Sequence, residues 1–487
     1  MQQAYHPGVF ATTFLGHQGW MFRGTKAAVL VDPLLVEDFG TAHALEYRVF
    51  PPRVWTRDAM PALDAVILSH EHDDHFDIAS LALLDRAIPI YLSARSSSAA
   101  RTILDEMGFT VHAFVPGVPV KFGDLEITPF AGDHVQTGTG DEWDTLPFLV
   151  RSTEGHGSFF SMVDIPITQQ HVEWAAARAM RPGVISWTNN AMDWSHMASY
   201  LSERAEGTQK CFVDMGVGHK LVTSTWGVPA AMVMCAGGFA FHDELAWLNH
   251  RVFCVDTDAV CAQMTKVYKN EKFVSGVPGQ TFVMQANKLK AIEPAAPFLA
   301  TTPRDSWPSR AKQQTSVPDY APATSRELAP GQLDALPAQL DAFAGSLVGG
   351  LTFRSLCSLL DSECEGRLPT FAIALRDGDR RHMFAYEPTA CRFAPSELPD
   401  DRFIAGIECW AADFAAVLAG ALGPIALTFN RSRLWSHVKR FHFDIFPDLY
   451  RVSHPLRRPD AYLATYRRLW AAAKDTQPVF RAATATQ

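Results

Sequence analysis

Short apolar runs, each ended by polar residues or by a turn containing glycine, dominate the first 290 residues of the chain. Runs of this length are typical of strands buried on both faces. The pattern predicts strands over 9–15, 27–31, 65–69 and 90–93, and helices over 78–87 and 97–107. Strands and helices therefore alternate in this part of the chain, and the strand over 65–69 ends directly before a strongly polar segment.

Further strands with tight turns follow, and helices then return. Strands are expected over 111–115, 120–122, 125–130, 146–152 and 158–163, and helices over 168–180 and 196–205. This mixture favours two sheets covered by helices, an α/β layered fold over residues 1–290.

The amino-acid composition changes between 291 and 330, where seven prolines fall among Ala, Thr and Ser. We interpret this segment as a linker or a surface-hugging connection. Residues 331–487 then read as a second, smaller α+β domain. Its expected elements are helices over 333–360, 410–422 and 459–474 and strands over 370–375, 382–386, 402–407 and 425–429.

Composition and charge argue against several classes of function. A formal net charge of −9 argues against sequence-independent nucleic-acid binding, which needs clustered Lys and Arg. The eight cysteines form no C-x-x-C pair, which is typical of reduced thiols in a cytosolic protein. The N-terminus lacks the pattern of a signal peptide. The most apolar stretch, 411–429, contains Asp413 and a proline, so no membrane span is expected and the predicted location is cytoplasmic.

The polar segment after 65–69 is Ser-His-Glu-His-Asp-Asp-His. Alternate residues at a strand end point the same way, so His70 and His72 share a side, and the following turn brings Asp74 and His75 towards the same point. Imidazole and carboxylate are the ligands of zinc, iron or manganese. His134 and Asp164 also follow strand-like runs and are further candidate ligands. The sequence therefore predicts a metal centre.

The spacing His70-x-His72-x-Asp74-His75, followed by a downstream His and then an Asp, resembles the metallo-β-lactamase superfamily. The resemblance implies an αββα sandwich that binds one or two metals. It implies that His70, His72 and His134 hold one metal, and that Asp74, His75 and a last His hold the other, with Asp164 bridging. We assign the last His to His242, which follows an apolar run; the competitors are His219 and His250.

Two narrower resemblances follow. Gly16-His17-Gln18-Gly19-Trp20 is similar to the lactonase-like branch, in which this His lies beside the site. Stretches in both domains, among them 132–145 and 404–446, resemble the CMP-N-acetylneuraminate hydroxylases. Those enzymes carry a Rieske domain with C-x-H and C-x-x-H ligands, and this chain shows neither pair. Electrons would then come from a separate ferredoxin or reductase. Residues 335–433 weakly resemble a sterol-carrier-type domain.

These resemblances imply an enzyme. The preferred hypothesis is a non-haem (di)iron oxygenase that hydroxylates or oxidises a small polar metabolite. The alternative is a dinuclear-metal hydrolase of a lactone, ester or phosphoester. A third hypothesis is a scaffold or lipid-binding module with a structural metal. The cofactor is expected to be one or two divalent ions, with iron favoured and zinc or manganese as alternatives.

Candidate catalytic residues are Asp74 and Asp164, which would orient water or receive its proton, and His17 at the substrate pocket. Asp133 is a candidate acceptor for the ring N–H of His134, and Asp32 for bracing the ligand loop. Other candidates for the pocket are Trp143, Asn189, Asn190 and Trp194.

Overall fold

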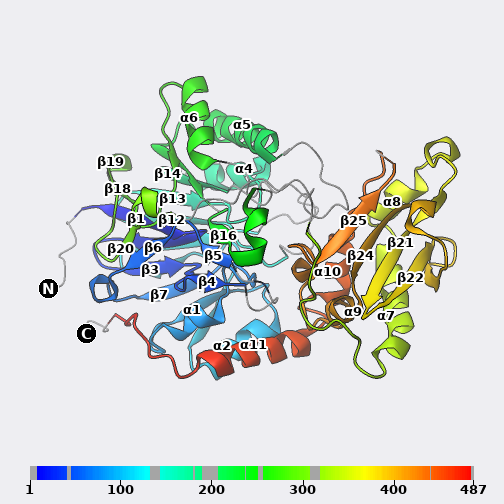
Figure 1. The fold of residues 1–487 in the computed structure, drawn as a ribbon. Helices are drawn as coiled ribbons and strands as arrows, with labels where there is room; N and C mark the ends of the chain where they lie inside the picture. The colour runs from blue at the N-terminus through cyan, green and yellow to red at the C-terminus, as the bar shows by residue number, and fades with distance from the viewer. Residues whose placement is uncertain are drawn as a thin grey trace.

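The structure is a computed structural model, which describes residues 8–40, 45, 47–131, 143–178, 181–188, 207–235, 237–250, 256–307, 318–438 and 440–483. Two β-sheets lie face to face in the N-terminal domain, with helices on both outer faces, and a smaller domain lies beside them (Figure 1). The expected α/β class, an αββα metallo-β-lactamase sandwich with a second α+β domain, is confirmed.

The first sheet has eight strands in the order β19-β18-β1-β2-β3-β7-β8-β9. Their bounds are β1 Phe10–Gly16, β2 Gly19–Arg23, β3 Ala28–Val31, β7 Ala65–Leu68, β8 Ile90–Ser93, β9 Val111–Phe114, β18 Thr281–Gln285 and β19 Lys288–Glu293. Strand β2 was not predicted from the sequence, because the short loop after β1 turns the chain straight back into a hairpin. Strands β3, β7, β8 and β9 run parallel, so their carboxyl ends lie at one edge.

The second sheet has seven strands in the order β10-β11-β12-β13-β14-β15-β17. Their bounds are β10 Val120–Phe122, β11 Leu125–Pro129, β12 Phe148–Ser152, β13 Ser158–Ser161, β14 Val184–Thr188, β15 Ala231–Cys235 and β17 Phe273–Ser275. The last four of these run parallel.

Strand β2 shows how successive side chains face opposite sides of the first sheet. Trp20 and Phe22 point between the sheets, where both rings pack on Phe159 at centroid distances of 4.7 and 4.9 Å. Met21, between them, faces the helices on the other side of the sheet. Full burial of one such side chain contributes about 1.5–3 kcal/mol. The apolar layer between the sheets thus fixes which residues reach the edge where the polar loops lie.

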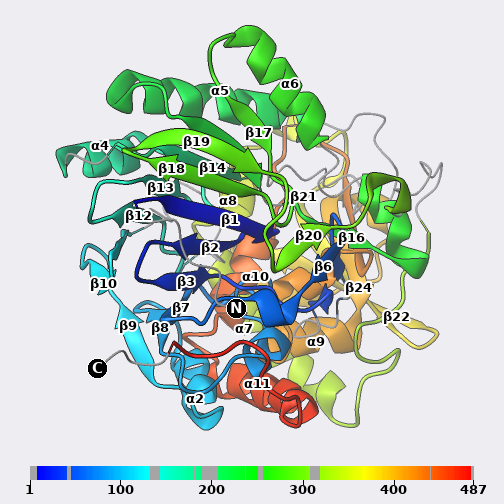
Figure 2. The same cartoon turned by 90° about the vertical axis from the view of Figure 1, so that its left-hand side faces the viewer.

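Helices cover both outer faces (Figure 2). The first sheet carries α1 (Ile78–Ala82) and α2 (Ser98–Glu106), and the second carries α4 (Gln169–Ala177), α5 (Gly207–Trp226) and α6 (Thr257–Val267). Side chains of Asp77, Ser97, Thr168 and Asp256 cap four of these helices. The helix expected over 196–205 lies outside the described residues.

The C-terminal domain is a five-stranded sheet in the order β23-β22-β21-β24-β25, with helices against one face. Its strands are β21 Leu368–Asp377, β22 Arg380–Glu387, β23 Arg392–Pro395, β24 Phe403–Trp410 and β25 Ser432–Ser436, and its helices are α7 Gln332–Leu347, α8 Leu351–Cys357, α9 Ala411–Ala419 and α10 Phe446–Ser453. The strand predicted over 425–429 is wrong. Pro424 starts a 3-10 helix there (η8, Pro424–Leu427), because proline fixes a helical φ at the first position.

Two segments cross the expected boundaries. Within the predicted linker 291–330, β20 (Leu299–Thr301) pairs with β6 (Arg53–Trp55), so this part belongs to the N-terminal domain. At the other end, α11 (Pro459–Ala473) leaves the C-terminal domain and packs on α1 and α2. Phe480 continues there in a bridge with Leu84. The apolar face of α11 is thus buried on the first sheet's helices, and the division into domains at 330 stays a prediction.

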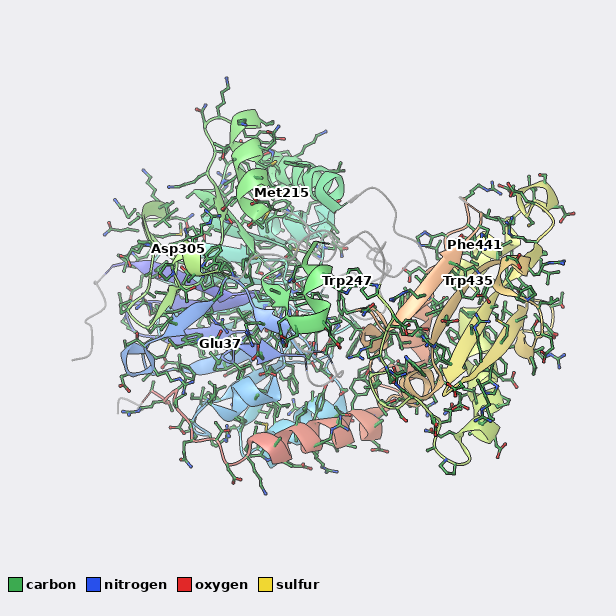
Figure 3. All side chains as sticks on the ribbon, viewed as in Figure 1. Glu37, Met215, Trp247, Asp305, Trp435 and Phe441 are labelled. Carbon is green, nitrogen blue, oxygen red and sulfur yellow. The ribbon has the colours of Figure 1, made fainter. Side chains whose placement is uncertain are left out.

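An aromatic junction joins the two domains. It consists of Phe39, Tyr47, Phe239, Phe241, Trp247 and Phe429. The first five come from the N-terminal domain, partly from the small sheet of β4 (Asp38–Phe39), β5 (Tyr47–Val49) and β16 (Phe239–Phe241). Phe429 reaches in from the C-terminal domain, 5.1 Å from Phe241 between ring centroids. Figure 3 shows Trp247 on the side of the N-terminal domain that faces the C-terminal domain, which carries Trp435 and Phe441.

Among the described helices, none is both long enough and apolar enough to cross a lipid bilayer.

Candidate metal centre

The polar loop lies between the buried strand β7 and the capped helix α1. The carbonyl of His72 accepts the backbone N–H groups of His75 (2.9 Å) and Phe76 (2.6 Å). This tight turn folds the second half of the loop back over the first. Side chains separated by several residues therefore converge on one point at the edge of the sheet.

A first cluster consists of His17, Asp74 and His75, whose donor atoms all lie within 4.8 Å of one another. His17 Nε2 lies 2.5 Å from Asp74 Oδ2, and His75 Nε2 lies 3.6 Å from the same oxygen. His17 occupies the turn of the β1–β2 hairpin with φ 53°, in the left-handed region. The β1–β2 hairpin thus brings His17 close to the loop that follows β7 in the same sheet.

A second cluster consists of His70, His72 and Asp164, again with donor atoms within 4.8 Å of one another. Asp164 follows β13 in the other sheet. Its Oδ2 lies 3.7 Å from His70 Nε2 and 2.8 Å from His75 Nε2, so one carboxylate touches both clusters. The two clusters form one continuous centre between the sheets.

The arrangement fits metal ions. An ion holds imidazole and carboxylate ligands at about 2.0–2.2 Å, so its donor atoms lie within roughly 4 Å of one another, close to the spacing found here. The other ring nitrogens are engaged: His70 Nδ1 lies 2.9 Å from Ser69 Oγ, and His75 Nδ1 lies 3.0 Å from Asp32 Oδ2. Both rings therefore turn Nε2 into the centre.

Asp32 organises the loop, as expected from the sequence. Its Oδ1 accepts the Ser69 backbone N–H at 2.7 Å, and its Oδ2 accepts the Ser69 hydroxyl at 2.7 Å besides contacting His75. Asp32 is 1% exposed and has φ 46° at the end of β3. One buried carboxylate thus fixes both the strand end and a ring of the first cluster.

The ionisation of each group in the centre depends on its charged neighbours. Burial alone would raise the pKa of Asp74, but the charge of His75 and the hydrogen bond with His17 hold that pKa well below its usual range. Burial opposes the charging of His75, yet Asp74, Asp164 and Asp32 together raise its pKa well above the usual value. The centre therefore balances imidazoles against carboxylates, and a bound cation would take the place of the imidazole protons.

Gln18 is a supporting residue that sequence reasoning missed. It is buried beside His17, and its Nε2 donates to Asp164 Oδ1 at 2.9 Å and to the Val163 carbonyl at 3.0 Å. The Cys235 thiol donates to Gln18 Oε1 at 3.2 Å. Its position next to the candidate His17 was the available signal, but its partners lie in the other sheet.

Glu71 ties the loop to α2 and α11. Its carboxylate accepts the hydroxyl of Ser97 at 2.8 Å and that of Tyr466 at 3.4 Å. Burial raises the pKa of Glu71 to about 7 against the effect of these hydrogen bonds. A residue between two candidate ligands is thus braced by the helix that returns from the C-terminal domain.

The C-terminal domain also approaches the other side of the second cluster. Trp143 lies 6.3 Å from His72 and 4.4 Å from His454, measured between ring centroids. Burial, followed by the charge of Arg457, lowers the pKa of His454 to about 4, so the ring is neutral at pH 7. Trp143, a predicted pocket residue, therefore lies between the centre and the second domain.

The remaining predicted residues are placed as follows. His134, Asp133, Asn189, Asn190 and Trp194 lie outside the described residues. His242 belongs to neither cluster, and its Nδ1 contacts Asp243 at 2.8 Å instead. His219 pairs with Glu271 at 2.6 Å, also outside both clusters. Of His250 only the backbone is described. In the described part of the chain, the third member of the first cluster is His17, and the assignment of a late histidine as a ligand stays a prediction.

No curated protein matches the chain. Among solved structures, the metallo hydrolase Igni18 from Ignicoccus hospitalis is 14% identical, with a TM-score of 0.37, and the match covers 56% of this chain and 98% of that one. An isothiocyanate hydrolase from Delia radicum gut bacteria is 17% identical, with a TM-score of 0.38 and coverage of 57% and 99%.

The diiron β-hydroxylase CmlA from Streptomyces venezuelae is 16% identical, with a TM-score of 0.38, and the match covers 58% of this chain and 54% of that one. The resemblance to CMP-N-acetylneuraminate hydroxylases stays a prediction. Residues 28–223 match the family model of the beta-lactamase superfamily domain. Together with the two-sheet sandwich and the His/Asp clusters between its sheets, this match supports placing the N-terminal domain in the metallo-β-lactamase superfamily.

Proposed function

We propose that this protein is a hydrolase that uses two metal ions to cleave a lactone, an ester or a phosphoester. The observation that carries the proposal is the continuity of the two clusters through Asp164, which contacts His75 at 2.8 Å and His70 at 3.7 Å. A carboxylate in this position would be available to an ion held by either cluster. Two-metal sites of this kind serve hydrolysis by activating a water and polarising the scissile group.

In this proposal His17, Asp74 and His75 hold one ion, and His70, His72 and Asp164 hold the other. His134 is retained as an expected further ligand. With Asp164 counted for both ions and His134 added, each ion would have four protein ligands, which leaves a fifth position for water or substrate. The side chain of Asp74 is 20% exposed and that of Asp164 7%, so Asp74 faces the accessible side of the centre. We assign Asp74 the role of receiving the proton from the attacking water.

A second candidate function is the non-haem diiron oxygenase that the sequence resemblance favours. A donor set of imidazoles and carboxylates also suits iron. In addition, the His17 ring lies 6.0 Å from Phe39 and 5.8 Å from Phe239 between ring centroids, and such aromatic surroundings keep bulk water from one side of the centre. Hydrolysis ranks first because it needs only water beyond these residues, whereas oxygenation needs electrons from a partner.

The two candidates differ in metal and reaction. Protein purified without added metal or chelator is analysed for metal content and absorption, then loaded separately with zinc, manganese or iron. The proposal expects turnover of one class among lactones, carboxylic esters and phosphodiesters without any reductant. Absence of hydrolysis with all three metals, together with reductant-dependent dioxygen uptake by the iron form, would replace the hydrolase by the oxygenase.

Matched variants test the site itself. His72→Ala combined with Asp74→Ala should abolish metal binding and activity while the C-terminal domain stays folded. His242→Ala is the control histidine, because it lies outside both clusters, and it should keep its metal. Full metal retention in the double variant would contradict the assignment, and metal loss in His242→Ala would restore the late histidine as a ligand.

A further inference from the structure

A hollow of about 610 Å³ lies in the C-terminal domain, and none of its lining residues belongs to the two clusters. It lies between α7, α10 and the turn that leads into α11. The lining residues are Ala342, Gly345, Ser346, Arg451, Val452, Arg457 and Arg458. Its volume falls within the roughly 300–1,000 Å³ of small-molecule sites.

The lining carries excess positive charge. Arg451 donates through Nη1 to Asp448 Oδ1 at 2.9 Å and to the Ser346 carbonyl at 3.3 Å, so this guanidinium is held in one orientation at the wall. Arg457 and Arg458 are exposed and follow one another in the turn. Three guanidiniums against the one carboxylate of Asp448 leave a surplus of two positive charges.

The floor of the hollow is made of small residues. Ala342, Gly345 and Ser346 lie three and four positions apart and so share one face of α7. A Cβ atom built on Gly345 would meet no atom within 4 Å. Space is therefore open directly above the helix backbone.

The positive end of α11 adds to this charge. Arg458 is the N-cap of this 15-residue helix, and no side chain caps it. Pro459 offers no N–H and the Ala461 N–H donates to the Arg458 carbonyl, so it is the helix dipole that favours an anion at this end. Asp460 lies in the first turn but does not line the hollow. Guanidinium groups and the helix end therefore point to the same class of ligand.

We propose that this hollow binds the phosphate group of a small molecule of about nucleotide size. The planar fork of arginine matches phosphate oxygens in a bidentate way. The volume suits a small ligand. The net charge of −9 disfavours a polynucleotide, which requires a broad basic surface.

Calorimetric titration with inorganic pyrophosphate tests the proposal on the full chain. Because phosphates also bind metal ions, the titration is done on the wild type and on the His72→Ala/Asp74→Ala variant. Both should bind one pyrophosphate in the hollow with a Kd below about 1 mM. Replacing Arg457 and Arg458 by Ala should weaken this binding at least tenfold, whereas Arg468→Ala on the exposed face of α11 should leave it unchanged.

Gly345→Leu provides an independent test, because it fills the hollow without touching a charge. It should abolish saturable binding, while Gly216→Leu, at an equally open position on α5, should not. Binding that disappears with the metal-site variant alone would assign the anion to the metal centre. Binding that survives both Gly345→Leu and the double Arg variant would overturn the proposal, as would a chain that binds no pyrophosphate.

Discussion

Asp32→Asn should weaken metal binding without changing any proposed ligand. The aspartate oxygens accept three hydrogens, two from Ser69 and one from His75, at 2.7–3.0 Å. Asparagine has the same shape and tolerates the left-handed φ of 46° at this position. The substitution therefore tests the hydrogen bonds rather than the packing.

The size of the effect follows from the geometry. If the new NH₂ group faces the Ser69 N–H, two donors oppose each other and one charge-assisted bond is lost. If it faces His75, the ring must accept at Nδ1 and carry its proton on Nε2, the atom that should bind metal. Loss of one such bond costs about 1.5–3 kcal/mol of stability. Loss of a partner behind a metal ligand lowers metal affinity about 10- to 100-fold.

Competition with a chromophoric chelator measures the metal affinity, and urea unfolding of the metal-free chain measures the stability. Asp64→Asn is the matched control, because Asp64 accepts one backbone N–H, that of Ala28 at 2.8 Å, and belongs to neither cluster. Wild-type metal affinity in Asp32→Asn would refute the argument that Asp32 sets the orientation of His75.

Three further substitutions are informative. Tyr466→Phe keeps the ring but removes the hydroxyl that donates to Glu71, so urea unfolding should show a loss of about 1 kcal/mol that Tyr462→Phe does not share. Burial raises the pKa of Asp448 from 3.8 to about 6, so the wild type should lose about 2 kcal/mol of stability as pH rises from 4 to 7 and the carboxyl ionises. Urea midpoints measured across that range should show this loss in the wild type and not in Asp448→Asn. In Gly238→Ala the new Cβ would lie 2.9 Å from the His17 backbone, so metal analysis should show weakened binding of one ion, and unchanged binding would argue against His17 as a ligand.

The metal loop could be predicted from the sequence because its chemistry is local. An apolar run, four candidate ligands within six positions and a helix cap at Asp77 together define a strand end, a turn and a helix start. The layered fold could be predicted for a similar reason. Short apolar runs and apolar residues at helical spacing show directly which residues are buried.

The place of His17 in the first cluster depends on contacts between distant parts of the chain, which no local sequence pattern reveals. His242 follows an apolar run, as a strand-end ligand would, yet the described geometry brings His17 to Asp74 instead. That contact depends on a hairpin at the start of the chain and on the pairing of β3 with β7. The return of α11 to the first sheet escaped prediction in the same way, because an amphipathic helix does not specify which surface buries it.

The most direct test of the dinuclear centre is the number of metal ions per chain, measured by elemental analysis on wild type and on His17→Ala after loading and desalting. Two ions in the wild type and about one in His17→Ala are predicted, because His17 belongs to one cluster only. A wild type that holds at most one ion, or a His17→Ala variant that still holds two, would contradict the centre described here.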